Sequence, residues 1–160
     1  MPCPSLPSPP VLQVCAHRRV VPSTRAPQLW TIQPSVMTPS RTLRGHTASL
    51  SCVAAEGSLL ATGAEDRTVR LWDSRDGTAV ATLAERGALS ACCICERALL
   101  TSCNGSPLIR VWDLRARKVI AQLPSTCGTV CALAMAPGQV LSGDEWGRLR
   151  VRQQPPFCAV

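Results

Sequence analysis

The stretch from Leu59 to Asp73, LLATGAEDRTVRLWD, recurs twice further along the chain at an interval of forty residues. Each copy has an apolar run, a group of polar turn residues, and a second run of strand-favouring residues. Apolar runs on both sides of glycine- or aspartate-containing turns predict β-hairpins. A hairpin cannot bury its own faces, so it must pack against copies of itself.

The three copies can be aligned by counting forty residues, without a gap. This alignment places Trp72-Asp73 on Trp112-Asp113, and Thr62 on Ser102 and Ser142. A period near forty residues that contains several short strands is typical of a propeller-type array of small sheets. We therefore expect an all-β chain.

The sequence resembles the WD-repeat family. Thr42-Leu43-Arg44-Gly45-His46 precedes the first copy of the hairpin, and members of this family carry Gly-His near the start of a repeat and Trp-Asp near its end. The resemblance implies a partial β-propeller with three four-stranded antiparallel blades. Gln28 to Ile32 and Ser40 to Arg44 are expected to be the remnant of a preceding blade.

One repeat also matches the hydrogen-bond chain that the family uses inside a blade: His46, Thr62, Asp66 and Trp72. Such a chain is physically reasonable, because a buried indole N–H needs an acceptor and an imidazole can link a hydroxyl to a carboxylate.

The other two repeats depart from this pattern. In the second, the alignment puts Arg86 at the histidine position and Ser106 at the aspartate position, so that only Ser102 and Trp112 remain. In the third, Arg152-Gln153 replaces Trp-Asp. We therefore expect the second and third blades to be less rigid.

The chain divides into two regions. Residues 1–27 are rich in proline and are expected to form a disordered leader. Residues 28–160 are expected to form the WD-repeat region, with repeats at 42–83, 84–123 and 124–160, the last of them degenerate. A closed propeller typically needs 4–8 blades. We therefore favour the interpretation that the chain is a fragment or splice form. Alternatively, it associates with other copies or a partner, or it folds poorly alone.

The residues give no support for an enzyme. His46 accompanies no nucleophile motif, and neither a phosphate loop nor a dinucleotide fingerprint is present. Cys92 and Cys95 form a C-x-x-C, but no second pair exists, and strand alternation places these two on opposite faces. We expect no catalytic residue, no metal and no cofactor.

Cysteine usage indicates the cellular compartment. Most of the ten cysteines of the chain lie in predicted strands, where free cysteine acts as a small apolar residue. No signal peptide precedes them, and no apolar run approaches the ~20 residues of a membrane span. A reducing compartment, the cytosol or the nucleus, fits best.

The expected function is that of a non-catalytic scaffold or adaptor that binds proteins. The resemblance implies docking on the turns between the second and third strands and on the loops that enter each first strand. The chain places the following residues there: Thr47, Ser49, Glu65, Arg67, Glu145 and Trp146. Trp146 is the strongest candidate anchor, because exposed tryptophans often dominate interfaces. By family analogy, a substrate receptor of a ubiquitin-ligase complex is one such role.

Two alternatives remain open. The net charge is +7, and residues 1–55 contain five arginines and no acid, whereas the remaining chain is close to charge balance. A nucleic-acid-associated factor would use this leader and the stripe Arg148, Arg150 and Arg152. Because the basic residues are not concentrated on the repeats, this reading is weakened. The other alternative is a truncated product with no function of its own.

Overall fold

The computed structural model describes residues 12–15, 28–33, 36–95, 97–125, 128–136 and 138–153, with side chains from Arg41 onward. All regular elements in these ranges are β-strands, and they form four antiparallel sheets. The first contains β1 (Leu12–Cys15), β2 (Gln28–Gln33) and β3 (Val36–Thr42). The second contains β4 (Leu50–Glu56), β5 (Leu59–Ala64), β6 (Thr68–Asp73) and β7 (Ala79–Ala84). The third contains β8 (Leu89–Cys95), β9 (Ala98–Cys103), β10 (Leu108–Asp113) and β11 (Lys118–Pro124). The fourth contains β12 (Val130–Ala136), β13 (Gln139–Asp144) and β14 (Leu149–Gln153).

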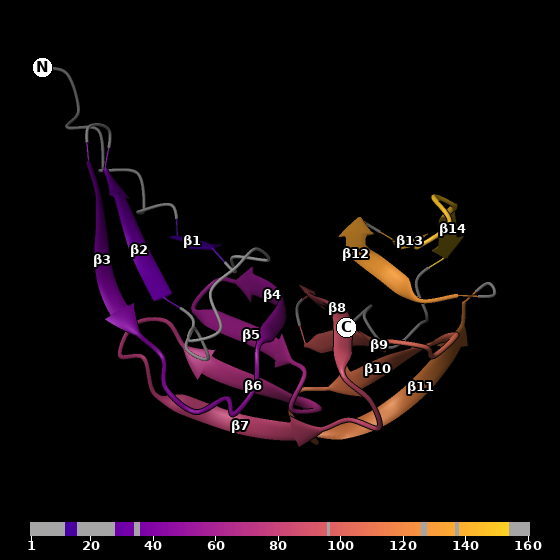
Figure 1. Ribbon diagram of the computed structural model, residues 1–160, viewed down its shortest axis with the longest axis horizontal. Coiled ribbons are helices and arrows are strands. Elements are labelled where there is room, and N and C mark those ends of the chain that lie inside the picture. Colours follow the sequence, from indigo (N-terminus) through magenta and orange to yellow (C-terminus); the bar gives the residue numbers. More distant parts are fainter. Residues whose placement is uncertain are drawn as a thin grey trace, which may run out of the picture.

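The sheets follow one another around an open arc (Figure 1). Strands β4, β8 and β12 lie next to one another on the inner side, and β7 and β11 lie on the outer side. Sheet β1–β3 stands at one end of the arc and sheet β12–β14 at the other. The prediction of an all-β partial propeller is therefore confirmed.

The hydrophobic core lies between the sheets. One buried cluster joins sheet β4–β7 to sheet β8–β11, with Ala61 and Leu71 on one side and Leu89 and Leu99 on the other. A second cluster joins sheet β8–β11 to sheet β12–β14 and includes Ile109, Val111 and Val130. Each sheet thus depends on its neighbours to cover its faces.

The structure differs from the sequence analysis near the N-terminus. Leu12–Cys15, within the leader to which we assigned no regular structure, forms β1 and pairs antiparallel with β2. This segment is free of proline, so it can take part in a ladder. The remainder of the leader and the stretch beyond Gln153 lie outside the described residues. No helical segment in the described part of the chain has the length and apolar character of a membrane span.

Candidate functional site: a rim of turns above buried hydrogen-bond chains

The structure brings His46, Thr62, Asp66 and Trp72 together in one connected chain. His46 Nδ1 lies 2.8 Å from Asp66 Oδ2, and His46 Nε2 lies 2.8 Å from the Thr62 hydroxyl. The indole N–H of Trp72 donates to the same hydroxyl at 2.8 Å. His46, Thr62 and Trp72 are all buried. This hydrogen-bond chain thus links β5 and β6 to the segment that enters β4.

Asp66 holds the β5–β6 turn and the loop that enters β4 in place. Its Oδ1 accepts hydrogen bonds from the backbone N–H of Thr68 at 3.0 Å and from the Thr68 hydroxyl at 2.6 Å. Its Oδ2 accepts one from the backbone N–H of Thr47 at 3.0 Å. Burial opposes ionisation of Asp66, but these bonds and His46 outweigh it and lower its pKa to about 2.

The second complete sheet holds its tryptophan with different residues from those we predicted. The indole N–H of Trp112 donates to Glu85 Oε1 at 2.9 Å and to the Thr101 hydroxyl at 3.0 Å. The Thr101 hydroxyl donates to Glu85 Oε1 at 2.5 Å, and Arg110 forms an ion pair with Glu85 Oε2 at 2.5 Å. The second repeat therefore keeps a hydrogen-bond chain, in which Glu85 and Thr101 stand where the count of forty placed Arg86 and Ser102. The placement of Ser102 in this hydrogen-bond chain was wrong, and the lower rigidity of this blade stays a prediction.

Strand pairing explains the error. Thr62 is opposite Arg70, and the residue opposite Arg110 is Thr101. Three residues separate β5 from β6, whereas four separate β9 from β10, so a count of forty places the second strand one residue too far along. Because strand side chains alternate, a one-residue shift exchanges the two faces. Ser102 accordingly faces the next sheet, where its hydroxyl donates to Val130 O at 3.2 Å.

The last sheet has a third arrangement. Arg152 is opposite Val140 as Trp72 is opposite Leu60, so an arginine takes the place of the tryptophan. Asp144 organises the β13–β14 turn instead. Its Oδ1 accepts the backbone N–H of Trp146 at 3.1 Å and that of Arg148 at 2.8 Å.

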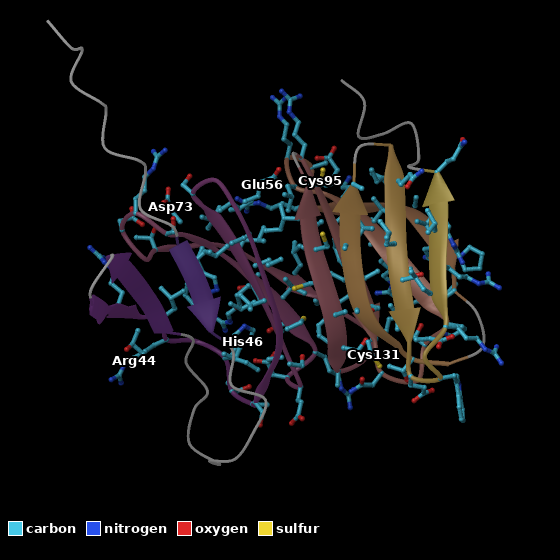
Figure 2. The ribbon with its side chains drawn as sticks, turned by 90° about the horizontal axis from the view of Figure 1, so that it is seen from above. Arg44, His46, Glu56, Asp73, Cys95 and Cys131 are labelled. Atoms are coloured by element: carbon cyan, nitrogen blue, oxygen red, sulfur yellow. The ribbon has the colours of Figure 1, made fainter. Side chains whose placement is uncertain are left out.

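The turns between second and third strands form one edge of the molecule, here called the rim: residues 65–67, 104–107 and 145–148, with the entering loops 46–49, 85–88 and 128–129. A backbone hydrogen bond joins each turn to its loop: Glu65 N to Ser49 O, Asn104 N to Ala88 O, and Glu145 N to Thr129 O. His46 lies toward this edge, whereas Glu56, Asp73 and Cys95 lie toward the opposite one (Figure 2).

All six residues predicted to bind partners lie on the rim and are exposed, namely Thr47, Ser49, Glu65, Arg67, Glu145 and Trp146. Trp146 is 69% exposed. A Cβ added to Gly128 would lie 2.8 Å from the indole nitrogen of Trp146, so the indole lies close against this glycine. Glu145 Oε1 accepts the backbone N–H of Thr129 at 3.0 Å. Trp146 therefore projects from a turn whose backbone is fixed on both sides.

Comparison with known proteins agrees with this architecture. The family model described as "WD domain, G-beta repeat" matches residues 37–73, which contain the complete His46 chain. Residues 37–73 thus match one WD repeat.

Similar proteins include the small ribosomal subunit protein RACK1 of Brassica napus, which is 33% identical over 84 residues. That match covers 51% of this chain and 26% of the relative. The p21-activated protein kinase-interacting protein 1-like of Danio rerio is 29% identical over 131 residues, covering 81% of this chain and 33% of the relative. This chain thus spans about a quarter to a third of these relatives.

Among solved structures, the computationally designed Ika8 protein has the same fold. It superposes with a TM-score of 0.70 at 19% identity. The match covers 94% of this chain and 44% of the designed chain. At this identity the similarity supports the fold only.

The cysteines that the structure describes lie in the sheets. Cys92 is buried in the cluster between the second and third sheets, and it shares a hydrogen bond with Cys52 of β4. That hydrogen bond and burial raise the pKa of Cys92 well above its usual value, while the same bond lowers the pKa of Cys52. Thiols free of disulfides include those of Cys52, Cys92, Cys93, Cys103 and Cys131.

Two features of the site were missed by sequence reasoning. Glu85 could have been found by allowing the alignment to shift by one residue, since an acid next to the expected position is a suitable partner for both Trp112 and Arg110. The support that Gly128 gives to Trp146 has no local sequence signal, because it depends on which side chain lies over the glycine.

Proposed function

We propose that this chain is a non-catalytic scaffold or adaptor that binds a protein partner through the rim. The observation that carries the proposal is Trp146, a large aromatic side chain that is 69% exposed on a turn with a fixed backbone. Tryptophans in such positions are enriched among the residues that contribute most to binding. A fixed turn also reduces the entropy lost when a partner docks.

Other rim residues provide the polar surroundings that an anchor needs. Glu145 and Arg148 flank Trp146, and Glu65 and Arg67 are exposed on the β5–β6 turn. Interfaces commonly surround an apolar anchor with polar residues at their margin. The buried hydrogen-bond chains that contain His46 and Glu85 hold the strands beneath the rim. The proposed role of these two residues is therefore structural.

The relatives indicate what kind of partner to test. One is named as a protein of the small ribosomal subunit, and another as a protein that interacts with p21-activated kinase. Both names describe proteins that act within assemblies. The finer proposal of a substrate receptor in a ubiquitin-ligase complex rests on family analogy, and fold alone does not determine function.

The alternative of nucleic-acid binding receives less support. Arg150 is opposite Ser142 in the same way that Arg70 is opposite Thr62, so it repeats a position that holds arginine in every repeat. At that position in the third sheet, Arg110 pairs with Glu85 inside the molecule. The middle arginine of the stripe is therefore accounted for by the repeat pattern.

Quantitative affinity capture from cell extract tests the proposal. The wild-type chain, Trp146→Ala and the control Val80→Ala are compared, since Val80 is exposed on the outer strand β7, away from the rim. We expect Trp146→Ala to lose bound proteins that Val80→Ala retains, with affinity falling about tenfold or more. Identical sets of captured proteins for all three chains would contradict the proposal.

A further inference from the structure

The outer face of sheet β12–β14 is apolar and uncovered in the described residues. Leu149 is 68% exposed and Val151 is 55% exposed. The equivalent side chains of the two preceding sheets are buried: Val69 and Leu71 on β6 are 0% and 2% exposed, and Ile109 and Val111 on β10 are 0% and 1% exposed. The same positions are therefore core residues wherever another sheet follows.

Strand register defines the extent of this end face. Leu149 is opposite Gly143, which is opposite Ala132, and Val151 is opposite Leu141, which is opposite Ala134. Directly opposed residues point to the same side of a sheet. We call these two rows the end face: Ala132, Gly143, Leu149, Ala134, Leu141 and Val151. It carries no charged residue, and in this respect it matches the rows that are buried in the interior of the arc.

The chain itself shows what covers a face of this kind. Rows Cys52, Gly63, Val69 and Ala54, Ala61, Leu71 of the second sheet are covered by the third sheet, and the third sheet is covered likewise by the fourth. The partner for the end face is thus another sheet of the same family. Within this chain, the sheet with a face turned away from the arc is β1–β3, at the opposite end (Figure 1).

We propose that the end face packs against sheet β1–β3 of a second copy of this chain, and that two copies close one ring of eight sheets. Propellers close with up to eight blades, which two arcs of four sheets would supply. The arc superposes on just under half of the designed chain of the same fold, so two copies would nearly equal its length. Each copy would contribute both ends, and a two-fold axis would make the two contacts equivalent.

This inference is independent of the proposed function. The rim lies along an edge of the sheets, whereas the end face lies on a flat side, so ring closure leaves Trp146 accessible. Trp146→Ala is accordingly expected to remain a dimer. Failure of the capture experiment and failure of dimerisation can therefore be distinguished.

Sedimentation velocity of the full chain at micromolar concentration tests the proposal. We expect the wild type to sediment as two chains, and the double variant Leu149→Asp with Val151→Asp as one. The matched control is Val80→Asp with Val119→Asp, because these valines are exposed on the outer strands β7 and β11 and belong to no end face. The control should sediment as two chains.

A monomeric wild type, an open series of larger oligomers, or a double variant that stays dimeric would each overturn the proposal. Circular dichroism establishes that the variants are folded. Ala134→Lys provides a second variant on β12, in the same row as Val151, and it should also yield a folded monomer. A folded Ala134→Lys chain that remains dimeric would contradict the proposal even if the double variant does not fold.

Discussion

Trp112 donates its indole N–H directly to Glu85 at 2.9 Å, whereas Trp72 contacts His46 only through the Thr62 hydroxyl. The buried indole N–H at this position of the repeat therefore donates to a hydroxyl linked to an imidazole in one sheet, and to a carboxylate in the next. In the carboxylate system, Arg110 supplies the balancing charge, so Glu85 is buried as one member of an ion pair.

Replacement of Glu85 should be strongly destabilising. In Glu85→Ala, Arg110 loses its ion-pair partner and the indole N–H of Trp112 keeps only the Thr101 hydroxyl as acceptor. We expect a loss of about 3–5 kcal/mol in the free energy of unfolding. Arg86→Ala, at the neighbouring exposed position, should change it by less than about 0.5 kcal/mol. Urea denaturation of both variants measures the difference. Equal losses would show that Glu85 is not the residue that holds this sheet.

Asp66 should make stability depend on pH in the acid range. The folded-state pKa of Asp66, about 2, lies below its ordinary value of 3.8, so the ionised carboxylate stabilises the fold above pH 4. The contribution, about 2 kcal/mol, is lost as pH falls through 2. The stability gap between wild type and Asp66→Asn should therefore shrink between pH 5 and pH 2 in denaturant titrations. A gap that stays constant over this range would refute the assignment.

Two equivalent glycines should respond differently to alanine. A Cβ on Gly63 would lie 2.5 Å from Cys52 Sγ and 2.9 Å from Leu89 Cγ, and Leu89 is completely buried. Gly63→Ala should therefore cost about 1–3 kcal/mol. Gly143 occupies the same register position in the last sheet, where a Cβ would meet only the Ala132 Cβ at 3.6 Å. Gly143→Ala should leave the denaturation midpoint unchanged or raise it slightly.

The thiols should react in an order that follows their surroundings. Cys131 is exposed, whereas burial and the charge of Glu85 raise the pKa of Cys103, and Cys92 is shielded between two sheets. Among Cys131, Cys92 and Cys103, under native conditions at pH 8, we expect iodoacetamide to modify Cys131 first and the other two later. Peptide mass mapping over time measures the order, and equal labelling in denaturant is the control. Early labelling of Cys92 would contradict the packing of β8.

Strand positions could be predicted closely from the sequence. Leu59 to Asp73 was expected to contain two strands joined by a polar turn, and it contains β5 and β6. Apolar runs between Gly, Asn and Asp turn residues carry this information locally. The residues of the His46 chain could be named in the same way, because one repeat retains all of them.

The register of sheet β8–β11 could not be obtained by counting. Thr101 and Ser102 both carry hydroxyls, and Glu85 and Arg86 are both polar, so either member of each pair is a plausible match. Only strand pairing shows that the turn after β9 has gained a residue. The uncovered end face was also hidden, because Leu149 and Val151 have the same pattern as buried Val69 and Leu71.

The longer β9–β10 turn shows where this fold tolerates extra chain. One added residue has left Thr101 opposite Arg110, as Thr62 is opposite Arg70, so the ladder is undisturbed. Asn104 and Gly105 at the tip are exposed. A short epitope tag or a fluorophore-carrying loop inserted after Asn104 would therefore label the protein without displacing a core side chain.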